Sequence, residues 1–504
     1  MYFPSSPAEE AVAAELAGVR PSLGPGYAAA LSGARAAVLT RLWRALAFEP
    51  LPWVVGRERG PDGLTLLLAG GARLEGPLPD PYATEPYVSE LLLDGRAYGQ
   101  AAPLVTALGP AHGKEFAAEV DGSTASLALS RAGQPPAGKD SAPGATWEWE
   151  QRVVDGHPYH PNCRSRPGFS VAEQLAYAPE HRPVVELGLV AVPAEKCLVT
   201  GDWPESLQDA GRILVPVHPW QAARVLRHER VRPGFAAHPL MALRTLAPAD
   251  GGPHVKTALS ARLTSSVRDI SVYSIETAAA VSAFAQGLCE RLDGRLHITR
   301  TLGAATAHTP DLAAVLREPP EVHADAGAGE RVLPVAALAS FPPARSAAWR
   351  ADFARLALSV CLRVLELGVA LEAHGQNLLV VLSATGAPIR LVYRDLADMR
   401  ISPARLVRHG LPVPPLSGRL ITDDVTVLRR KLFGSMLTGA LGATAGSAGA
   451  FAEALAEVSS LPATADTEAL LTGPLPTKAL TLMRLSPGIP GDQWAELPNP
   501  LAGG

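Results

Sequence analysis

The sequence predicts an α+β protein with more than one domain. Its 504 residues are enough to form roughly two to four domains, each with its own hydrophobic core. Apolar residues at helical spacing begin near Ala351. They end at a polar segment, after which two apolar runs, Leu378–Leu382 and Ile389–Tyr393, flank a turn. A further run alternates in polarity from Val255 onward. We therefore expect both helices and strands, with a hairpin in the C-terminal half.

The first 130 residues are expected to form helices and hairpins. Ala8–Leu42 is helix-rich, Leu64–Leu68 and Ala72–Leu74 flank a Gly-Gly turn, and Glu90–Leu93 is a further apolar run. Ser130–Ala145 is rich in Pro, Gly, Ser and Ala, which is typical of a loop or a domain link. The predicted domains are residues 1–139, 140–318 and 319–504.

Composition excludes several classes of protein. Apolar residues make up 47% and charged residues 19% of the chain, and the net charge is −4, which gives no support for a nucleic-acid partner. The four cysteines are far apart, which argues against a zinc ribbon or a disulfide framework and favours a reducing, cytoplasmic location. The N-terminus lacks the features of a signal peptide. The uncharged run Leu432–Ala452 is expected to be a packed helix without a membrane partner.

The segment between the predicted helix and the hairpin carries the clearest chemistry. Glu372, His374, Gln376 and Asn377 precede the hairpin, and Asp395 follows it. The hairpin returns the chain, so Asp395 is expected beside Asn377 and Glu372. Oxygen ligands that converge in this way suit Mg²⁺ bound with nucleotide phosphates. The alternative is a helix cap followed by an ordinary hairpin.

A second polar segment, Gly156–Ser170, contains two His-Pro pairs. The prolines after His157 and His160 prevent a regular helix, so a rigid extended segment is expected, followed by Arg164 and Arg166. Histidine and arginine on a rigid loop suit a polyphosphate. Histidines that bond nearby backbone, or a two-histidine metal site without a clear third ligand, are the alternatives.

A third His-Pro pair follows a predicted strand that begins at Ile213. His218 and Trp220 in this position are expected to be core residues.

The segment His254–Ser271 is predicted to bind an anion. Alternation from Val255 to Thr264 places Lys256 and Arg262 on the polar face of one strand. Thr264, Ser265, Ser266 and Arg268 follow at its end. A solvated strand would also alternate, but its polar face would normally mix charge signs.

The remaining segments carry less chemistry. Glu276–Glu290 is expected to be a helix and Leu296–Thr299 a strand. Residues 304–349 show no catalytic pattern. Asp423–Ala440 is expected to be helical, with an interruption at Gly442–Gly449.

Taken together, these motifs resemble the IucA/IucC family of NRPS-independent siderophore (NIS) synthetases. The matching segments occur in the family order over about residues 155–500: HPYHPNCRSRPGFS, PVHPWQ, KTALSARLTSSVRDIS, EAHGQNLLV, YRD, KALTLMRL and NPL. The resemblance implies a multidomain thumb–fingers–palm architecture with a distantly kinase-like palm, usually in a homodimer. The three predicted domains would correspond to thumb, fingers and palm.

The resemblance also implies an activity. Members of the family use ATP, with Mg²⁺, to adenylate a carboxylic acid, usually citrate or a related polycarboxylate, and release pyrophosphate. An amine or alcohol then captures the acyl group and AMP leaves. Small-molecule acids and nucleophiles are therefore the expected partners.

Site roles follow from the resemblance, residue by residue. The catalytic residues would be Lys256, Arg268 and His374. The ATP-binding residues would be His157, Arg164, Arg166, Arg244, Lys256, Ser265, Ser266, Arg268, Gln376 and Asn377. The acid would be bound by Thr264, Arg268, His374, Lys478 and Arg484, and the metal by Glu372, Asn377 and Asp395.

The chain departs from the family pattern at two positions and in length. Arg164 replaces the usual lysine, and Ala242 stands where a serine is expected before Arg244. The chain is also short for the family. Two other functions remain as alternatives: a kinase-like phosphotransferase, which would need an aspartate in place of His374-Gly375-Gln376, and a non-catalytic protein that binds a carboxylate or a metal chelate.

Overall fold

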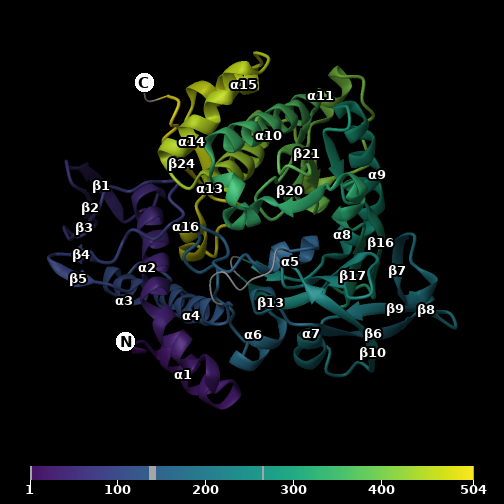
Figure 1. Ribbon diagram of the computed structural model, residues 1–504, viewed down its shortest axis with the longest axis horizontal. Coiled ribbons are helices and arrows are strands. Elements are labelled where there is room, and N and C mark those ends of the chain that lie inside the picture. The colour runs from purple at the N-terminus through teal and green to yellow at the C-terminus, as the bar shows by residue number, and fades with distance from the viewer. Residues whose placement is uncertain (1–2, 136–142, 264–265, 503–504) are drawn as a thin grey trace.

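The computed structural model describes residues 3–135, 143–263 and 266–502. Figure 1 shows the N-terminal elements on the left, a large sheet at the lower right and the C-terminal helices at the top. Within the described residues, the main sheets contain five, nine and four strands. The predicted combination of helices and strands is confirmed.

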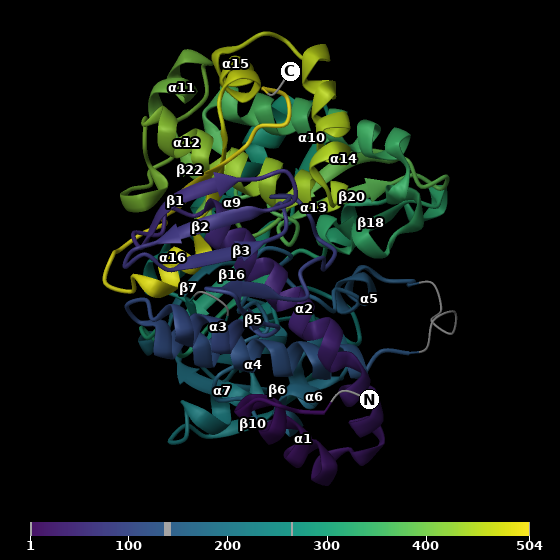
Figure 2. The same cartoon turned by 90° about the vertical axis from the view of Figure 1, so that its left-hand side faces the viewer.

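The N-terminal region packs helices against a small antiparallel sheet. The long helix α2 is buried along much of its length, and Trp43 at its C-terminal end is completely buried. Figure 2 shows β1, β2 and β3 stacked above α3 and α4. The elements are α1 (Pro7–Val19), α2 (Gly24–Phe48), α3 (Ala101–Leu108), α4 (Gly113–Ala132), β1 (Val54–Arg59), β2 (Leu64–Leu68), β3 (Arg73–Gly76), β4 (Leu91–Leu93) and β5 (Arg96–Tyr98).

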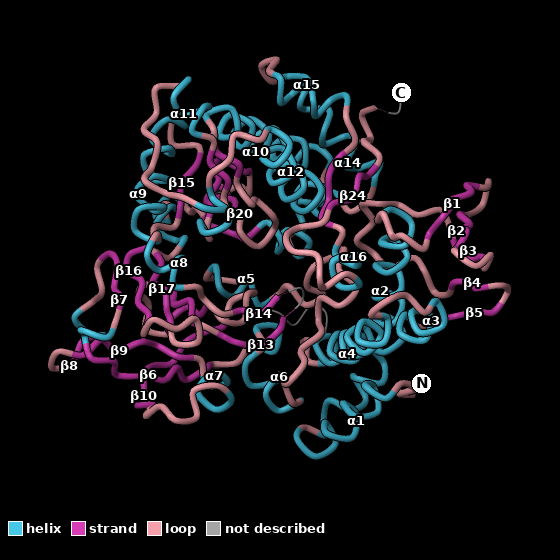
Figure 3. Tube along the Cα trace, turned by 180° about the vertical axis from the view of Figure 1, so that it is seen from behind, coloured by secondary structure: helices cyan, strands magenta, loops and turns pink. Residues whose placement is uncertain are grey.

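The large sheet has the strand order β7-β16-β17-β12-β11-β10-β6-β9-β8. Its strands are β6 (Val185–Pro193), β7 (Leu198–Gly201), β8 (Gln208–Asp209), β9 (Arg212–Val217), β10 (Val231–Pro239), β11 (Thr245–Pro248), β12 (His254–Thr257), β16 (Thr301–Thr306) and β17 (Ala313–Arg317). Helices of the same region are α5 (Thr146–Gln151), α6 (Val171–Tyr177), α7 (Pro219–Arg224), α8 (Val272–Glu276) and α9 (Ala278–Cys289). Figure 3 shows these strands gathered in one strand-rich region.

The third sheet has the order β15-β21-β20-β18 and contains the predicted hairpin. Its strands are β15 (Leu296–Ile298), β18 (Arg331–Pro334), β20 (Leu378–Leu382) and β21 (Pro388–Tyr393). The helix before the hairpin, α10 (Ala347–Leu367), begins at the N-cap Ser346 and ends at Gly368, whose φ of 114° suits glycine. All five side chains of β20 are buried.

The C-terminal segments complete the core around α10. They are β19 (Val369–Ala370), β22 (Arg400–Ile401), α11 (Pro403–Arg408), α12 (Val425–Leu432), a π-helix (Phe433–Leu441), α13 (Gly442–Ala445), α14 (Ala448–Leu455), α15 (Ala465–Thr472), β23 (Leu475–Lys478), α16 (Leu480–Leu485) and β24 (Trp494–Leu497). Helix α16 returns to contact α2 and α4 of the N-terminal region. No helix among the described residues is long and apolar enough to cross a membrane.

The prediction of one continuous strand from Val255 to Thr264 is wrong. Strand β12 ends at Thr257, and the chain then enters a separate hairpin of β13 (Leu259–Leu263) and β14 (Ser266–Arg268). The side chains of Gln221 and Asp311 bond Ser260 and hold it away from the large sheet. The apolar side of β13 packs in a different cluster, against Trp220. Lys256 and Arg262 therefore lie on different sheets.

One further expectation is wrong. The segment from 156 to 170 is a series of turns and not one extended run. In one of these turns the Cys163 N–H donates to the His160 carbonyl.

Candidate active site

The polar loop before the hairpin is held by its own backbone and by the π-helix. The N–H groups of Asn377 and Leu378 both donate to the His374 carbonyl at 2.9 Å. The Asn377 amide donates to the Glu372 carbonyl at 3.3 Å. From the π-helix, the Ser435 hydroxyl accepts the Ala373 N–H at 2.9 Å. The loop therefore has a defined shape before any ligand is present.

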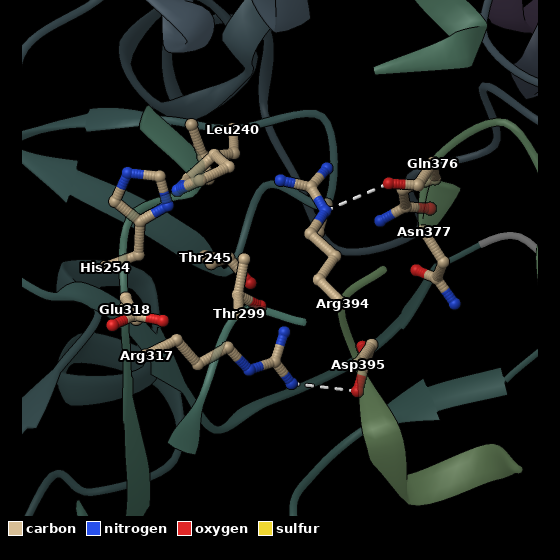
Figure 4. A pocket seen from close by; sticks show the side chains of 12 residues that line it. Leu240, Thr245, His254, Thr299, Arg317, Glu318, Gln376, Asn377, Arg394 and Asp395 are labelled. Atoms are coloured by element: carbon tan, nitrogen blue, oxygen red, sulfur yellow. Dashed lines mark hydrogen bonds and ion pairs between the residues drawn. The ribbon is translucent and has the colours of Figure 1, made fainter. Parts of the chain in front are cut away.

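Asp395 follows the hairpin and is fixed from two sides. The Arg394 N–H donates to the Asn377 carbonyl at 3.0 Å, and the Arg394 Nε donates to the Gln376 carbonyl at 3.0 Å (Figure 4). The same guanidinium forms a buried two-pronged pair with Glu150, at 2.6 and 3.0 Å. Asp395 itself has a φ of 68°, in the left-handed region. The hairpin thus brings Asp395 beside Asn377, as predicted.

Two cations from the large sheet meet Asp395. Lys256 Nζ lies 2.9 Å from Oδ1 and 3.0 Å from Oδ2 of Asp395, and Arg317 Nη2 lies 2.8 Å from Oδ1. Strand β12 supplies Lys256 and the adjacent strand β17 supplies Arg317, in a register that pairs His254 with Arg317. Figure 4 shows the Arg317–Asp395 pair.

Burial and charge shift the pKa values of this cluster in opposite directions. Burial alone would raise the pKa of Asp395, but Arg317 and Lys256 hold that pKa well below its usual range. Burial lowers the pKa of Lys256 to about 7, against the opposing effect of Asp395. Asp395 is therefore ionised at neutral pH.

Arg244 and Arg268 lie at the same site. Arg244 Nη1 donates to the carbonyls of Arg268 and Asp269, the latter at 2.7 Å, and so ties the end of β14 to the large sheet. Burial lowers the pKa of Arg244 to about 10. Burial also lowers the pKa of Arg268, while Asp395 and Glu372 act in the opposite direction. Both arginines line the central cavity.

This central cavity has a volume of about 640 Å³ and lies between the large sheet and the third sheet. Cationic side chains outnumber carboxylates along its wall. The predicted site residues that line it are Arg164, Arg166, Arg244, Lys256, Arg268, Glu372, His374, Gln376, Asn377 and Asp395. A cavity of this size and charge suits a polyanionic small molecule.

Glu372 is paired with two lysines that come from distant segments. Lys431 Nζ and Lys478 Nζ both lie 3.0 Å from Glu372 Oε1. Burial would raise the pKa of Glu372, but the two lysines lower it to about 2. Lys478 also pairs with Asp492 at 3.2 Å. In this arrangement Lys478 supports Glu372 and does not itself line the cavity.

The two arginines after the His-Pro pairs have different surroundings. Arg164 donates to the Val153 and Val154 carbonyls and to Glu180, at 2.5, 2.5 and 3.4 Å, so its guanidinium is largely occupied. Arg166 Nη2 pairs with Glu180 at 2.7 Å, but its buried Nη1 has no hydrogen-bond partner among the described residues. Arg166, a residue that lines the cavity, thus has one donor without a partner within the described residues.

Several predicted residues lie elsewhere. His157 Nδ1 accepts the Tyr159 N–H at 3.2 Å, and neither His157 nor Arg484 lines the cavity. Arg484 pairs with Glu119 of α4. Thr264 and Ser265 fall outside the described residues, as does the side chain of Ser266. The expectation that His218 and Trp220 are core residues is confirmed, since both are buried.

Sequence reasoning missed Arg317 and Lys431. Arg317 ends the apolar run Ala313–Leu316, and Asp395 likewise follows an apolar strand. The surrounding region is rich in Ala and Pro, which makes this signal hard to distinguish. Lys431 lies in a predicted helix with no motif around it, so the sequence offered no signal for it.

Among the described residues, no group of three or more His, Cys, Asp or Glu side chains is placed to hold a metal ion. Asn377 and Asp395 nevertheless line the cavity, and both carry side-chain oxygens. These donors fit a magnesium ion that is held mainly by phosphate oxygens, and do not form a closed protein site.

Two family models match the chain. Residues 145–340 match the IucA/IucC family, and residues 347–489 match a model described as a ferric iron reductase FhuF-like transporter. The first match contains Lys256 and Arg317, and the second contains Glu372 and Asp395.

Curated relatives resemble the chain at low identity. A Staphylococcus aureus protein, 2-[(L-alanin-3-ylcarbamoyl)methyl]-3-(2-aminoethylcarbamoyl)-2-hydroxypropanoate synthase, is 23% identical over 332 residues, which is 52% of this chain and 53% of that protein. The citryl-spermidine/3,4-dihydroxybenzoyl-citryl-spermidine:spermidine ligase of Bacillus anthracis is 24% identical over 314 residues, 50% of this chain and 51% of that protein. The chain therefore spans about half the length of the curated relatives that it matches.

Solved structures match nearly the whole chain. The petrobactin biosynthesis protein AsbB from Bacillus anthracis has a TM-score of 0.77 at 16% identity, covering 99% of this chain and 98% of that one. ATP-bound aerobactin synthetase IucA from Klebsiella pneumoniae has a TM-score of 0.73 at 20% identity, covering 93% and 99% of the two chains. At these identities the matches show a shared fold.

Proposed function

We propose that this chain, whose residues 145–340 match the IucA/IucC family, is an ATP-dependent ligase that adenylates a polycarboxylic acid and condenses it with an amine or alcohol. The observation that carries this proposal is the convergence of Lys256 and Arg317 on Asp395, beside the Glu372–Asn377 loop, in a cavity rich in cations. Two relatives, a ligase that acts on citryl-spermidine and spermidine and a D-ornithine–citrate ligase, support citrate or a citrate derivative as the substrate.

The chemistry needs the charges that the cavity provides. Attack of a carboxylate on the α-phosphorus of ATP brings two anions together, and negative charge then develops on the departing pyrophosphate. Lys256, Arg268 and Arg244 are proposed to offset that repulsion on the large-sheet side. Arg166, whose Nη1 has no partner, is proposed to bind a further oxygen of the phosphates or of the acid.

The loop before the hairpin is proposed to bind both substrates. His374 and Gln376 would contact the acid and ATP, and Asn377 and Asp395 would serve the nucleotide and its magnesium. When bound, Mg²⁺ would neutralise phosphate charge and stabilise the departing pyrophosphate. Glu372, with two lysines on one oxygen, is better suited to shape the loop than to hold the ion directly. These roles revise the predicted metal set.

The related architecture supports a domain assignment. We propose that residues 1–139 correspond to the thumb, 140–318 to the fingers and 319–504 to a palm that resembles kinases distantly, in a homodimer. The kinase alternative lacks an aspartate base in the loop before Asn377, where His374, Gly375 and Gln376 stand. The non-catalytic alternative does not explain why Asp395 is held in a fixed position.

ATP–pyrophosphate exchange over a panel of acids tests the proposal. We expect exchange with citrate or a related polycarboxylate, and release of AMP when an amine or alcohol is added. Formation of ADP and a phosphorylated acid would support the phosphotransferase. A lack of exchange with every acid, in a protein that also forms no AMP, would support the non-catalytic alternative.

A further inference from the structure

In the Lys256–Asp395–Arg317 cluster, the Asp395 carboxylate competes with any anion that enters the cavity. The two cations that could bind phosphate oxygens are already bound to a carboxylate, at 2.8 to 3.0 Å. The exposed fraction is 10% for either cationic side chain and 28% for Asp395, so water screens these ion pairs only in part. An arriving anion must displace Asp395 or meet its negative charge.

Asp395 cannot readily swing aside. The preceding residue, Arg394, is held through its backbone by Asn377 and through its side chain by Glu150. The left-handed backbone of Asp395, with φ at 68°, is an unusual conformation for a residue other than glycine, and the surrounding bonds maintain it. The backbone of Asp395 is therefore fixed, and the bonds to Lys256 and Arg317 hold its carboxylate at one place on the cavity wall.

We propose that Asp395 is an internal counter-ion that excludes free polyanions from Lys256 and Arg317 and admits them only when a divalent cation accompanies them. A divalent cation at the Asp395 carboxylate would reverse the local charge and release the two cations to the oxygens of the anion. Asp395 would thereby select a metal-complexed anion over a free one. This inference rests on the proposed function only for the identity of the anion.

Calorimetric binding of inorganic pyrophosphate, with excess chelator or with excess Mg²⁺, tests the inference without any turnover. For the wild-type chain we expect weak binding in chelator and at least tenfold tighter binding with Mg²⁺. For Asp395→Asn we expect binding in chelator to tighten at least tenfold over wild type, which corresponds to about 1.4 kcal/mol. The gain from Mg²⁺ should largely disappear in this variant.

Asp398→Asn is the matched control. Asp398 lines the same cavity but pairs with Arg419, at 3.0 Å, and contacts neither Lys256 nor Arg317. We expect its binding in chelator to change less than threefold. The double variant Asp395→Asn/Arg317→Met should lose most of the gain of the single one, because one of the released cations is then missing.

Thermal unfolding provides a second readout if Asp395→Asn is poorly stable. Pyrophosphate in chelator should then raise the unfolding temperature of the variant more than that of the wild type. The inference is overturned if Asp395→Asn binds free pyrophosphate no more tightly than wild type, or if Asp398→Asn shows the same gain. Failure of acid-dependent exchange, with this binding pattern intact, would count against the proposed function alone.

Discussion

Arg394 and Glu150 are 244 residues apart in the chain and form a buried two-pronged ion pair, with distances of 2.6 and 3.0 Å. Glu150 is completely buried at its side chain, and its Oε2 also accepts the Met241 N–H at 3.0 Å. The pair joins the end of the hairpin to α5 and to the segment before Arg244. It therefore sets the position of Asp395 relative to the large sheet.

Removal of one partner of this pair should be costly. We predict that Glu150→Ala lowers the free energy of unfolding by about 3–5 kcal/mol, because it leaves the Arg394 charge buried and unpaired. Urea unfolding measures this loss. Arg394→Lys keeps the charge and should cost less stability, yet it should lower exchange activity because a lysine cannot bond both carboxylate oxygens in the same plane. Equal stability of Glu150→Ala and wild type would show that the pair is not structural.

Lys256 and Arg268 should act on one anion. We predict that Lys256→Ala and Arg268→Ala each lower the rate of acid-dependent exchange about a hundredfold or more. The loss of transition-state stabilisation in the double variant should be smaller than the sum of the losses in the two single variants, because the residues share a ligand. Arg262 is an internal control: it lies on β13, is exposed, and does not line the cavity. A loss in Arg262→Ala as large as that in Lys256→Ala would contradict this division of roles.

Local sequence patterns predicted the parts of the site that neighbouring residues determine. The hairpin from Leu378 to Tyr393, the polar loop before it and the return of Asp395 beside Asn377 depend on turn residues and apolar runs within one short segment. Those features could be predicted because strand and turn preferences act over a few residues.

The sequence could not predict how distant segments pair. Arg317 reaches Asp395 only because β17 lies beside β12 in the large sheet, which no local pattern specifies. The same limit explains the error at Val255–Thr264. Alternation in polarity continues through Ala258, while contacts from Gln221 and Asp311 turn the chain out of the sheet. The sequence does alternate with a period of two, but tertiary contacts prevent the segment from forming one continuous strand.

Lys431 should stabilise the loop that contains His374. We predict that Lys431→Met lowers the free energy of unfolding by about 1.5–3 kcal/mol, since it removes a buried charged hydrogen bond and leaves Glu372 with Lys478 alone. Adding Glu372→Gln to this variant should recover part of the loss, because the unpaired carboxylate is then absent. Urea unfolding of the four proteins in this cycle gives the coupling. Strict additivity would mean that the two side chains do not interact.

The buried carboxylate of Glu49 should make the free energy of unfolding depend on pH, independently of the active site. Its carboxylate is 2% exposed and accepts the N–H groups of Thr481 and Leu482, at 3.2 and 2.7 Å, at the start of α16. Burial raises the pKa of Glu49 from 4.5 to about 7, although these bonds favour the ionised form.

The sign of the effect follows from proton binding. Between about pH 4.5 and pH 7 the folded protein keeps a proton on Glu49 that the unfolded chain has released. The free energy of unfolding should therefore fall as the pH rises through this range, by up to about 3 kcal/mol. Glu49→Gln stays neutral at every pH and should lack this contribution. Urea unfolding at about pH 5 and pH 7.5 compares the two proteins. An identical pH dependence would mean that Glu49 titrates alike in both states, and that the docking of α16 onto α2 does not depend on its protonation.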